Sequence, residues 1–84
     1  MFHVSIKYFA SVREALGKSS EALQTSALTV AELRDELIAR GGAFAQELAR
    51  GKSVRIALNH TMADEAAALS EGCEVAFFPP VTGG

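Results

Sequence analysis

Hydrophobic and polar residues alternate at the start of the chain. Every second residue from Phe2 to Tyr8 is apolar, which is the period of a half-buried strand. From Ala10 to Leu16 the apolar residues have helical spacing, and Gly17 is suited to end a short helix there. The next stretch is less regular and predicts a second strand around Glu21 to Thr25.

The strongest local signal is the start of a helix at Thr29. Thr29 and Glu32 have the spacing of a capping box, in which each side chain accepts from a backbone N–H at the helix start. Leu28 and Leu33 occupy the positions of a hydrophobic staple. The polar run 34–36 is expected to face water. The expected buried stripe consists of Val30, Leu33, Leu37 and Ile38.

The rest of the chain alternates short elements with turn residues. The glycine pair 41–42 is expected to end the helix, and a second short helix is expected from Ala43 to Arg50. Strand-like alternation returns from Val54 to Leu58 and from Glu74 to Phe78, with turn residues after the first of these strands. A short edge strand is expected within residues 66–69.

This order of elements predicts the fold class. One amphipathic helix must cover a mixed sheet, because neither layer could bury its apolar face alone. The first and last strands carry the strongest apolar faces, which is typical of central neighbours in a sheet. We therefore predict a two-layer α+β domain with the β-grasp (ubiquitin-like) arrangement over residues 1–78, followed by a protruding tail over residues 79–84.

Composition narrows the function. A chain of 84 residues has room for one small domain. The net charge of −2 and the scattered cations argue against nucleic-acid binding. No apolar run is long enough to span a bilayer, and no secretory leader is recognised, so we expect a cytoplasmic protein without a membrane partner.

Conventional catalytic motifs are missing from the sequence. His3 and His60 are each isolated and are expected to be ordinary surface or turn residues. Cys73 is the only cysteine, so it forms no intrachain disulfide or cysteine-cluster zinc site, and we expect it to be structural or incidental. We expect no metal site and no self-sufficient enzyme.

The end of the chain carries the most informative pattern. Pro79 and Pro80 lack backbone donors, so the last strand must stop there, and they favour a stiff, extended segment. A tip that ends in Gly83 and Gly84 can enter a channel that a side chain would block. The terminal carboxyl, with a pKa of about 3.3–3.7, is ionised and must be activated before a nucleophile can attack it. The alternative is a frayed terminus.

Residues 74–84 closely resemble the C-terminus of the small subunit of molybdopterin synthase. Residues 8–14, 29–33 and 58–61 resemble that family's first strand and helix, its main helix entry and its mid-chain turn. Diglycine alone is shared by many ubiquitin-like proteins, whereas the run from Phe77 to Gly84 is more specific. Cys73 stands where the family usually has Asp.

The resemblance implies a β-grasp sulfur carrier. An adenylating enzyme related to ubiquitin-activating proteins would use ATP to activate the carboxylate of Gly84, and a sulfur donor protein would convert it to a thiocarboxylate. The carrier itself would bind no cofactor. The tail would enter the large subunit of a heterotetrameric synthase, which supplies acid–base groups, and donate sulfur to cyclic pyranopterin monophosphate. Gly83, which has no side chain, would let the tip enter a narrow channel. The tail would be guided by Phe78, Pro79, Pro80, Val81 and Thr82.

The residues also predict a docking surface for a partner. Phe9 and Phe78 fall on the faces opposite the core sets of their strands, and Met62 follows an exposed turn. Together they would form an apolar patch beside the exit of the tail. Alternatively, sheet twist or a covering loop buries one or more of them.

Three other functions stay open at this point. A carrier for another pathway, such as thiamine synthesis, would use the same carboxylate, although residues 77–81 differ from those carriers. A ubiquitin-like modifier would join its activated carboxylate to protein lysines. A binding-only β-grasp domain would not need Gly84.

Overall fold

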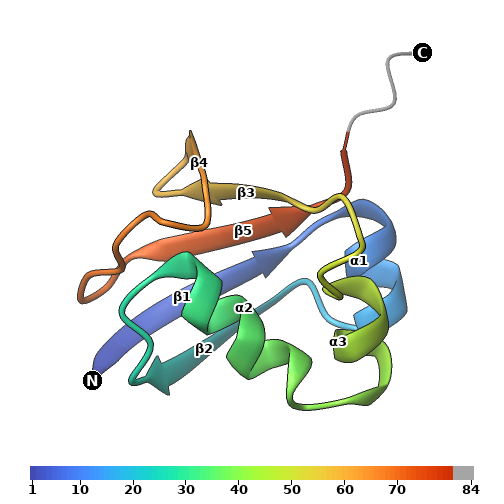
Figure 1. Ribbon diagram of the computed structural model, residues 1–84, viewed down its shortest axis with the longest axis horizontal. Coiled ribbons are helices and arrows are strands. Elements are labelled where there is room, and N and C mark those ends of the chain that lie inside the picture. The colour runs from blue at the N-terminus through green and yellow to red at the C-terminus, as the bar shows by residue number, and fades with distance from the viewer. Residues whose placement is uncertain (81–84) are drawn as a thin grey trace.

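The computed structural model describes residues 1–80, which form five strands and three helices (Figure 1). In chain order they are β1 (Phe2–Tyr8), α1 (Ala10–Leu16), β2 (Ser20–Thr25), α2 (Val30–Ile38), α3 (Gly42–Glu47), β3 (Arg55–Leu58), β4 (Thr61–Ala63) and β5 (Glu74–Phe78).

The strands form one mixed sheet in the order β2-β1-β5-β3-β4. The first and last strands, β1 and β5, are parallel neighbours near the centre, and the other pairs are antiparallel. Helix α2 lies across one face of the sheet, while α1 and α3 lie at the end where β5 finishes (Figure 1). This arrangement confirms the predicted two-layer α+β fold with a central pair of terminal strands.

The core lies between the sheet and α2. The strands contribute alternate residues, and α2 contributes its predicted stripe, as expected for an element that buries one face. The side chains that meet there are Val4, Ile6, Tyr8, Val30, Leu33, Leu37, Ile56, Val75 and Phe77, all buried.

The capping box at the start of α2 is confirmed. The hydroxyl oxygen of Thr29 accepts from the N–H of Glu32 at 3.2 Å. The carboxylate of Glu32 accepts from the N–H of Leu28 at 2.9 Å, one residue before the cap. The predicted hydrophobic staple does not bury Leu28, which is 61% exposed.

Two predictions about α2 are wrong. Arg34 does not face water but is 4% exposed, because backbone carbonyls beyond α3 satisfy its guanidinium. The helix ends at Ile38, before the glycine pair, and Gly42 is already the first residue of α3. The main-chain bond from Gly41 N–H to the carbonyl of Ile38 tightens the turn between the helices.

The edge strand is β4 and not a strand within residues 66–69. Asn59 and His60 both have positive φ, at 51° and 70°, so the chain reverses directly after β3. A two-residue turn of this kind joins adjacent antiparallel strands, and Thr61 therefore begins the edge strand. In the segment expected to be a strand, Ala68 makes an isolated bridge with Thr29.

Candidate functional site

The face of the sheet turned away from α2 has a central row of paired residues with two alanines in its middle. Lys7 pairs with Ala76, Ala76 with Ala57, and Ala57 with Met62. Residues paired directly across strands project to the same side, so these four residues lie in one row across β1, β5, β3 and β4. The two alanines keep the middle of this face low.

Two aromatic rings lie at the end of the same face. Phe9 and Phe78 meet edge to face, with ring centroids 6.4 Å apart and planes at 86°. The N–H of Phe9 donates to the carbonyl of Phe77 at 3.2 Å, which ties the end of β1 to the end of β5. Phe9 is 44% exposed, and Phe78 is half-buried.

The predicted docking residues therefore share one face of the sheet. The structure brings Phe9 and Phe78 into contact, while Met62, 55% exposed, lies in the row that contains the alanines. We call the set Phe9, Ala57, Met62, Ala76 and Phe78 the open-face patch. Whether it binds a partner stays a prediction.

Charged groups border this patch. A hollow of about 530 Å³ is lined by its rings and alanines together with Lys7, Arg13, His60 and Glu74. Nε2 of His60 lies 3.5 Å from a carboxylate oxygen of Glu74. Asn59 accepts from the N–H of Glu74 through its side chain at 2.9 Å, which fixes the turn beside β5. The hollow therefore combines aromatic rings and alanines with charged groups of both signs.

The chain leaves the sheet directly before the two prolines, as predicted from the sequence. β5 ends at Phe78, and the half-buried Pro79 and Pro80 follow it directly. They line a small hollow of about 200 Å³ together with residues of α1 and of the segment before β3. The predicted tail residues Val81, Thr82, Gly83 and Gly84 lie outside the described residues, so their roles stay predictions.

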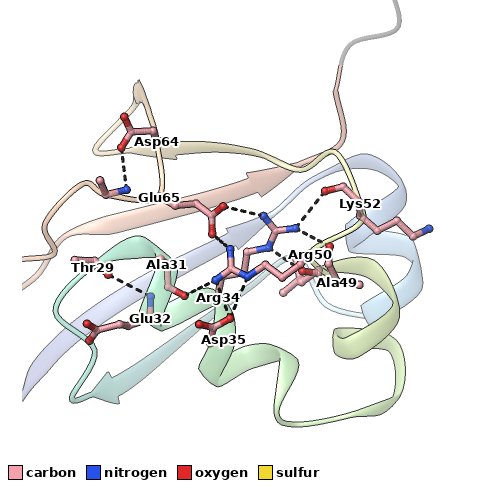
Figure 2. A network of polar contacts seen from close by, with 12 residues as sticks. Thr29, Ala31, Glu32, Arg34, Asp35, Ala49, Arg50, Lys52, Asp64 and Glu65 are labelled. Atoms are coloured by element: carbon pink, nitrogen blue, oxygen red, sulfur yellow. Dashed lines mark hydrogen bonds and ion pairs between the residues drawn. The ribbon is translucent and has the colours of Figure 1, made fainter.

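A polar network that joins α2 to the segment after α3 and to Glu65 was not expected from the sequence (Figure 2). The Nε of Arg34 donates to the carbonyl of Leu48 at 2.7 Å, and its Nη2 donates to Ala49 at 2.7 Å and Lys52 at 3.2 Å. Burial and the charge of Arg50 lower the pKa of Arg34. The sequence does contain a signal for the burial of Arg34, because position 34 lies on the same face of the helix as positions 30, 33 and 37.

A second polar cluster connects β1, β2 and the turn after α2. Tyr8 donates to Glu21 at 2.9 Å, and Nη1 of Arg40 donates to both oxygens of that carboxylate at 3.0 Å. Burial alone would raise the pKa of Glu21, but the hydrogen bonds from Tyr8 and Arg40, with the charges of Arg40 and Lys18, outweigh it and hold the pKa below its usual range. Burial and the neighbouring Glu21 raise the pKa of Tyr8.

Two further residues considered in the sequence, His3 and Cys73, make contacts within the domain. His3 lies 2.9 Å from a carboxylate oxygen of Glu71, and its backbone N–H also donates to that carboxylate, which lowers the pKa of Glu71. Cys73 is 3% exposed and belongs to the core.

Two site classes find no support in residues 1–80. No helix there has the length and apolar character needed to cross a membrane. Within the same range, no three His, Cys, Asp or Glu side chains gather closely enough to hold a metal ion. The predicted cytoplasmic location stays a prediction.

Comparison with known sequences gives a consistent family. A sequence model described as the ThiS family matches residues 6–84. The molybdopterin synthase sulfur carrier subunit of Haemophilus influenzae is 36% identical over 81 residues, covering 96% of this chain and 99% of that protein. The subunit of the same name from Escherichia coli is 38% identical over 81 residues, with the same coverage.

Solved structures agree on the fold. SAMP1 from Haloferax volcanii superposes with a TM-score of 0.77 at 26% identity, covering 98% of this chain and 99% of that chain. A chain from the complex of subunits 1 and 2 of the Helicobacter pylori molybdopterin-converting factor has a TM-score of 0.70 at 24% identity, covering 99% and 100% of the two chains. The second likeness shows the fold alone.

Proposed function

The chain belongs to the ThiS family, and from this membership we propose that it is the sulfur-carrying small subunit of a molybdopterin synthase. The observation that carries the proposal is the identity of 36% and 38% to two subunits of that name over 99% of their length. The match of the family model extends to residue 84 and so includes the diglycine.

The chemistry takes place at the carboxylate of Gly84. One carboxylate oxygen attacks the α-phosphorus of ATP on an adenylating enzyme, and pyrophosphate leaves. A hydrosulfide ion that the donor protein supplies then attacks the carbonyl carbon, the bond to AMP breaks so that AMP leaves, and loss of the remaining S–H proton gives the thiocarboxylate. Activation is required because the ionised carboxylate is a poor electrophile.

The acceptor reaction takes place on a partner. The large subunit would hold cyclic pyranopterin monophosphate and supply the acid–base groups, in a heterotetramer of two small and two large subunits. The open-face patch would dock on that subunit while residues 79–84 enter its active site. A chain of the same fold occurs in a complex of subunits 1 and 2 in Helicobacter pylori, so such a complex accommodates this fold.

Reconstitution of the transfer step tests this function. The loaded chain is mixed with the large subunit and cyclic pyranopterin monophosphate, and the pterin product and the mass of the chain are measured together. We expect sulfur to appear in the pterin as the chain returns to its carboxylate mass. Loss of the thiocarboxylate without sulfur in the pterin, with a large subunit active on another carrier, would contradict the proposal.

A second candidate is a ubiquitin-like protein modifier. The likeness to SAMP1 favours it, because small archaeal modifier protein 1 is the name given to structures of this fold. A modifier would form conjugates that survive denaturant and reductant, whereas a sulfur carrier would not form them routinely. A carrier for thiamine synthesis would donate sulfur to a different acceptor, and a binding-only domain would be unaffected by deletion of Gly84.

A further inference from the structure

The loop from residue 48 to residue 54 joins α3 to β3. Arg34, on α2, holds this loop through hydrogen bonds to its backbone. Three carbonyls of this loop, those of Leu48, Ala49 and Lys52, accept from its guanidinium at 2.7 to 3.2 Å. A planar guanidinium presents its donors in a fixed fork, so one side chain defines the positions of all three carbonyls. At 4% exposure, Arg34 has little freedom to move away.

A second arginine ties the same loop to its surroundings. Arg50 donates to the carbonyl of Ala31 at 3.1 Å and to Asp35 at 2.7 Å, both on α2. The carboxylate of Glu65, beyond β4, contacts the guanidinium groups of both Arg34 and Arg50 (Figure 2). The loop is therefore fixed against α2 and the segment after β4.

The other side of this loop faces the start of the tail. Lys52, Ser53 and Val54 line the hollow of about 200 Å³ that Pro79 and Pro80 also line. The sheet register explains this proximity, because Arg55 pairs with Phe78 and the strands are antiparallel, so the residue before one lies beside the residue after the other. The loop thus forms a wall beside the two prolines.

The direction of the chain at the two prolines depends on packing against a neighbouring segment such as this loop. The prolines have no N–H, so neither can donate a hydrogen bond that would continue the ladder of β5. Packing against a neighbouring segment can then set the direction in which the chain leaves the sheet. We propose that Arg34 is a positioning residue for the tail, which it directs by holding the loop that packs beside Pro79 and Pro80. This inference rests on the proposed function, in which the tail must enter a partner's active site.

The test compares Arg34→Lys with Arg40→Lys. The first variant keeps the charge but loses the fork that holds three carbonyls, and the second changes an arginine that follows α2 and bonds to Glu21 on β2. Carbon chemical shifts of Pro79 and Pro80, and amide shifts of Ser53 and Val54, are measured on each isolated chain. The rate of thiocarboxylate formation is then measured against carrier concentration with the adenylating enzyme.

We expect Arg34→Lys to shift the signals of both prolines and to lower kcat about tenfold, since a small misplacement of a reacting group has a large effect on rate. KM for the carrier should change less than about twofold, because Arg34 is buried and its replacement leaves the exposed surface of the chain unaltered. Arg40→Lys should leave both parameters and the proline signals unchanged. A folded Arg34→Lys chain with wild-type proline signals, or with wild-type kcat, would overturn the inference.

A second variant covers the case in which Arg34→Lys does not fold. Val54→Ala keeps the bonds of Arg34 and shortens the wall itself, so the same proline shifts and the same loss of kcat are expected. Unchanged proline signals in this variant would also overturn the inference. If the wild-type chain takes up no sulfur at all, the proposed function fails, while the proline signals of the isolated chain still decide whether Arg34 sets the direction of the tail.

Discussion

At the scale of single residues, Phe9 occupies a position that its helix does not explain. It is the N-cap of α1, where Ser, Thr, Asp or Asn would accept from a free N–H, and its side chain makes no such bond. It is also 44% exposed, so it adds little to the core. An aromatic residue that serves neither the cap nor the core fits a role in contact with a partner, as the open-face patch predicts.

Replacing Phe9 with Asp should therefore separate binding from folding. The cap gained should offset the lost contact with Phe78, so the free energy of unfolding should change by no more than about 1 kcal/mol. Binding to the large subunit should weaken by a factor of about ten to a hundred, because a charge would be buried in an apolar interface. Urea unfolding and titration calorimetry measure the two quantities.

Leu28→Asp is the matched control for that variant. Leu28 is also apolar and 61% exposed, but it lies at the entry to α2, in the layer opposite the open-face patch. The Leu28→Asp chain should bind the large subunit with the affinity of the wild type. Unfolding of the Phe9→Asp chain would show that Phe9 is needed for the core, and unchanged affinity would remove the patch from the interface.

Glu21 predicts a dependence of stability on pH. Its pKa is lowered in the folded chain, so the stabilisation by its ionised form is present above the unfolded pKa of about 4.5 and is lost as pH falls through the folded pKa. Glu21→Gln should thus be less stable than the wild type at neutral pH, by about 1 kcal/mol, and the difference should shrink in acid. Urea unfolding at pH 7 and at about pH 3 measures it; a difference that stays constant would show that the charge is not the cause.

At the scale of elements, the capping box should account for much of the local stability of α2. Thr29→Ala leaves the N–H of Glu32 without its acceptor and should lower the free energy of unfolding by about 1 kcal/mol. Thr29→Ser keeps the acceptor and should restore most of it. The midpoints of urea unfolding compare the three chains, and equal midpoints for Ala and Ser would mean that the hydroxyl does not cap the helix.

The elements also show what sequence patterns can and cannot locate. β1, α1 and β5 begin and end as predicted, because alternation, a C-terminal glycine and a following proline each mark a boundary locally. β4 was missed because its three residues are too few to show an alternation, although turn residues after Leu58 were predicted. The sequence predicts an exposed side chain for Arg34, because the carbonyls that it binds lie beyond α3 and are distant in sequence.

At the scale of the whole molecule, the central pairing of the first and last strands followed from their strong apolar faces, and the resemblance of residues 74–84 pointed to the family. Phe9, Met62 and Phe78 were grouped from the sequence, whereas Ala57 and Ala76 required the fold, since only the register aligns them with Met62. The rings of Phe9 and Phe78 in the patch, and the loop held by Arg34, lie beside the point where the chain leaves β5. Docking and delivery of the tail would therefore share one end of the molecule.

The central claim is that sulfur is carried at the terminus of the tail. The most direct measurement is the intact mass of the chain after incubation with the adenylating enzyme, ATP and a sulfur source. The wild type is compared with a chain that lacks Gly84 and with Cys73→Ala, whose missing thiol is buried in the core of the wild type.

We predict a gain equal to the replacement of one oxygen by one sulfur in the wild type and in Cys73→Ala, and no gain without Gly84. A gain that persists without Gly84, or that is lost in a folded Cys73→Ala chain, would contradict the account. So would no gain in the wild type, with an adenylating enzyme that is active on another carrier.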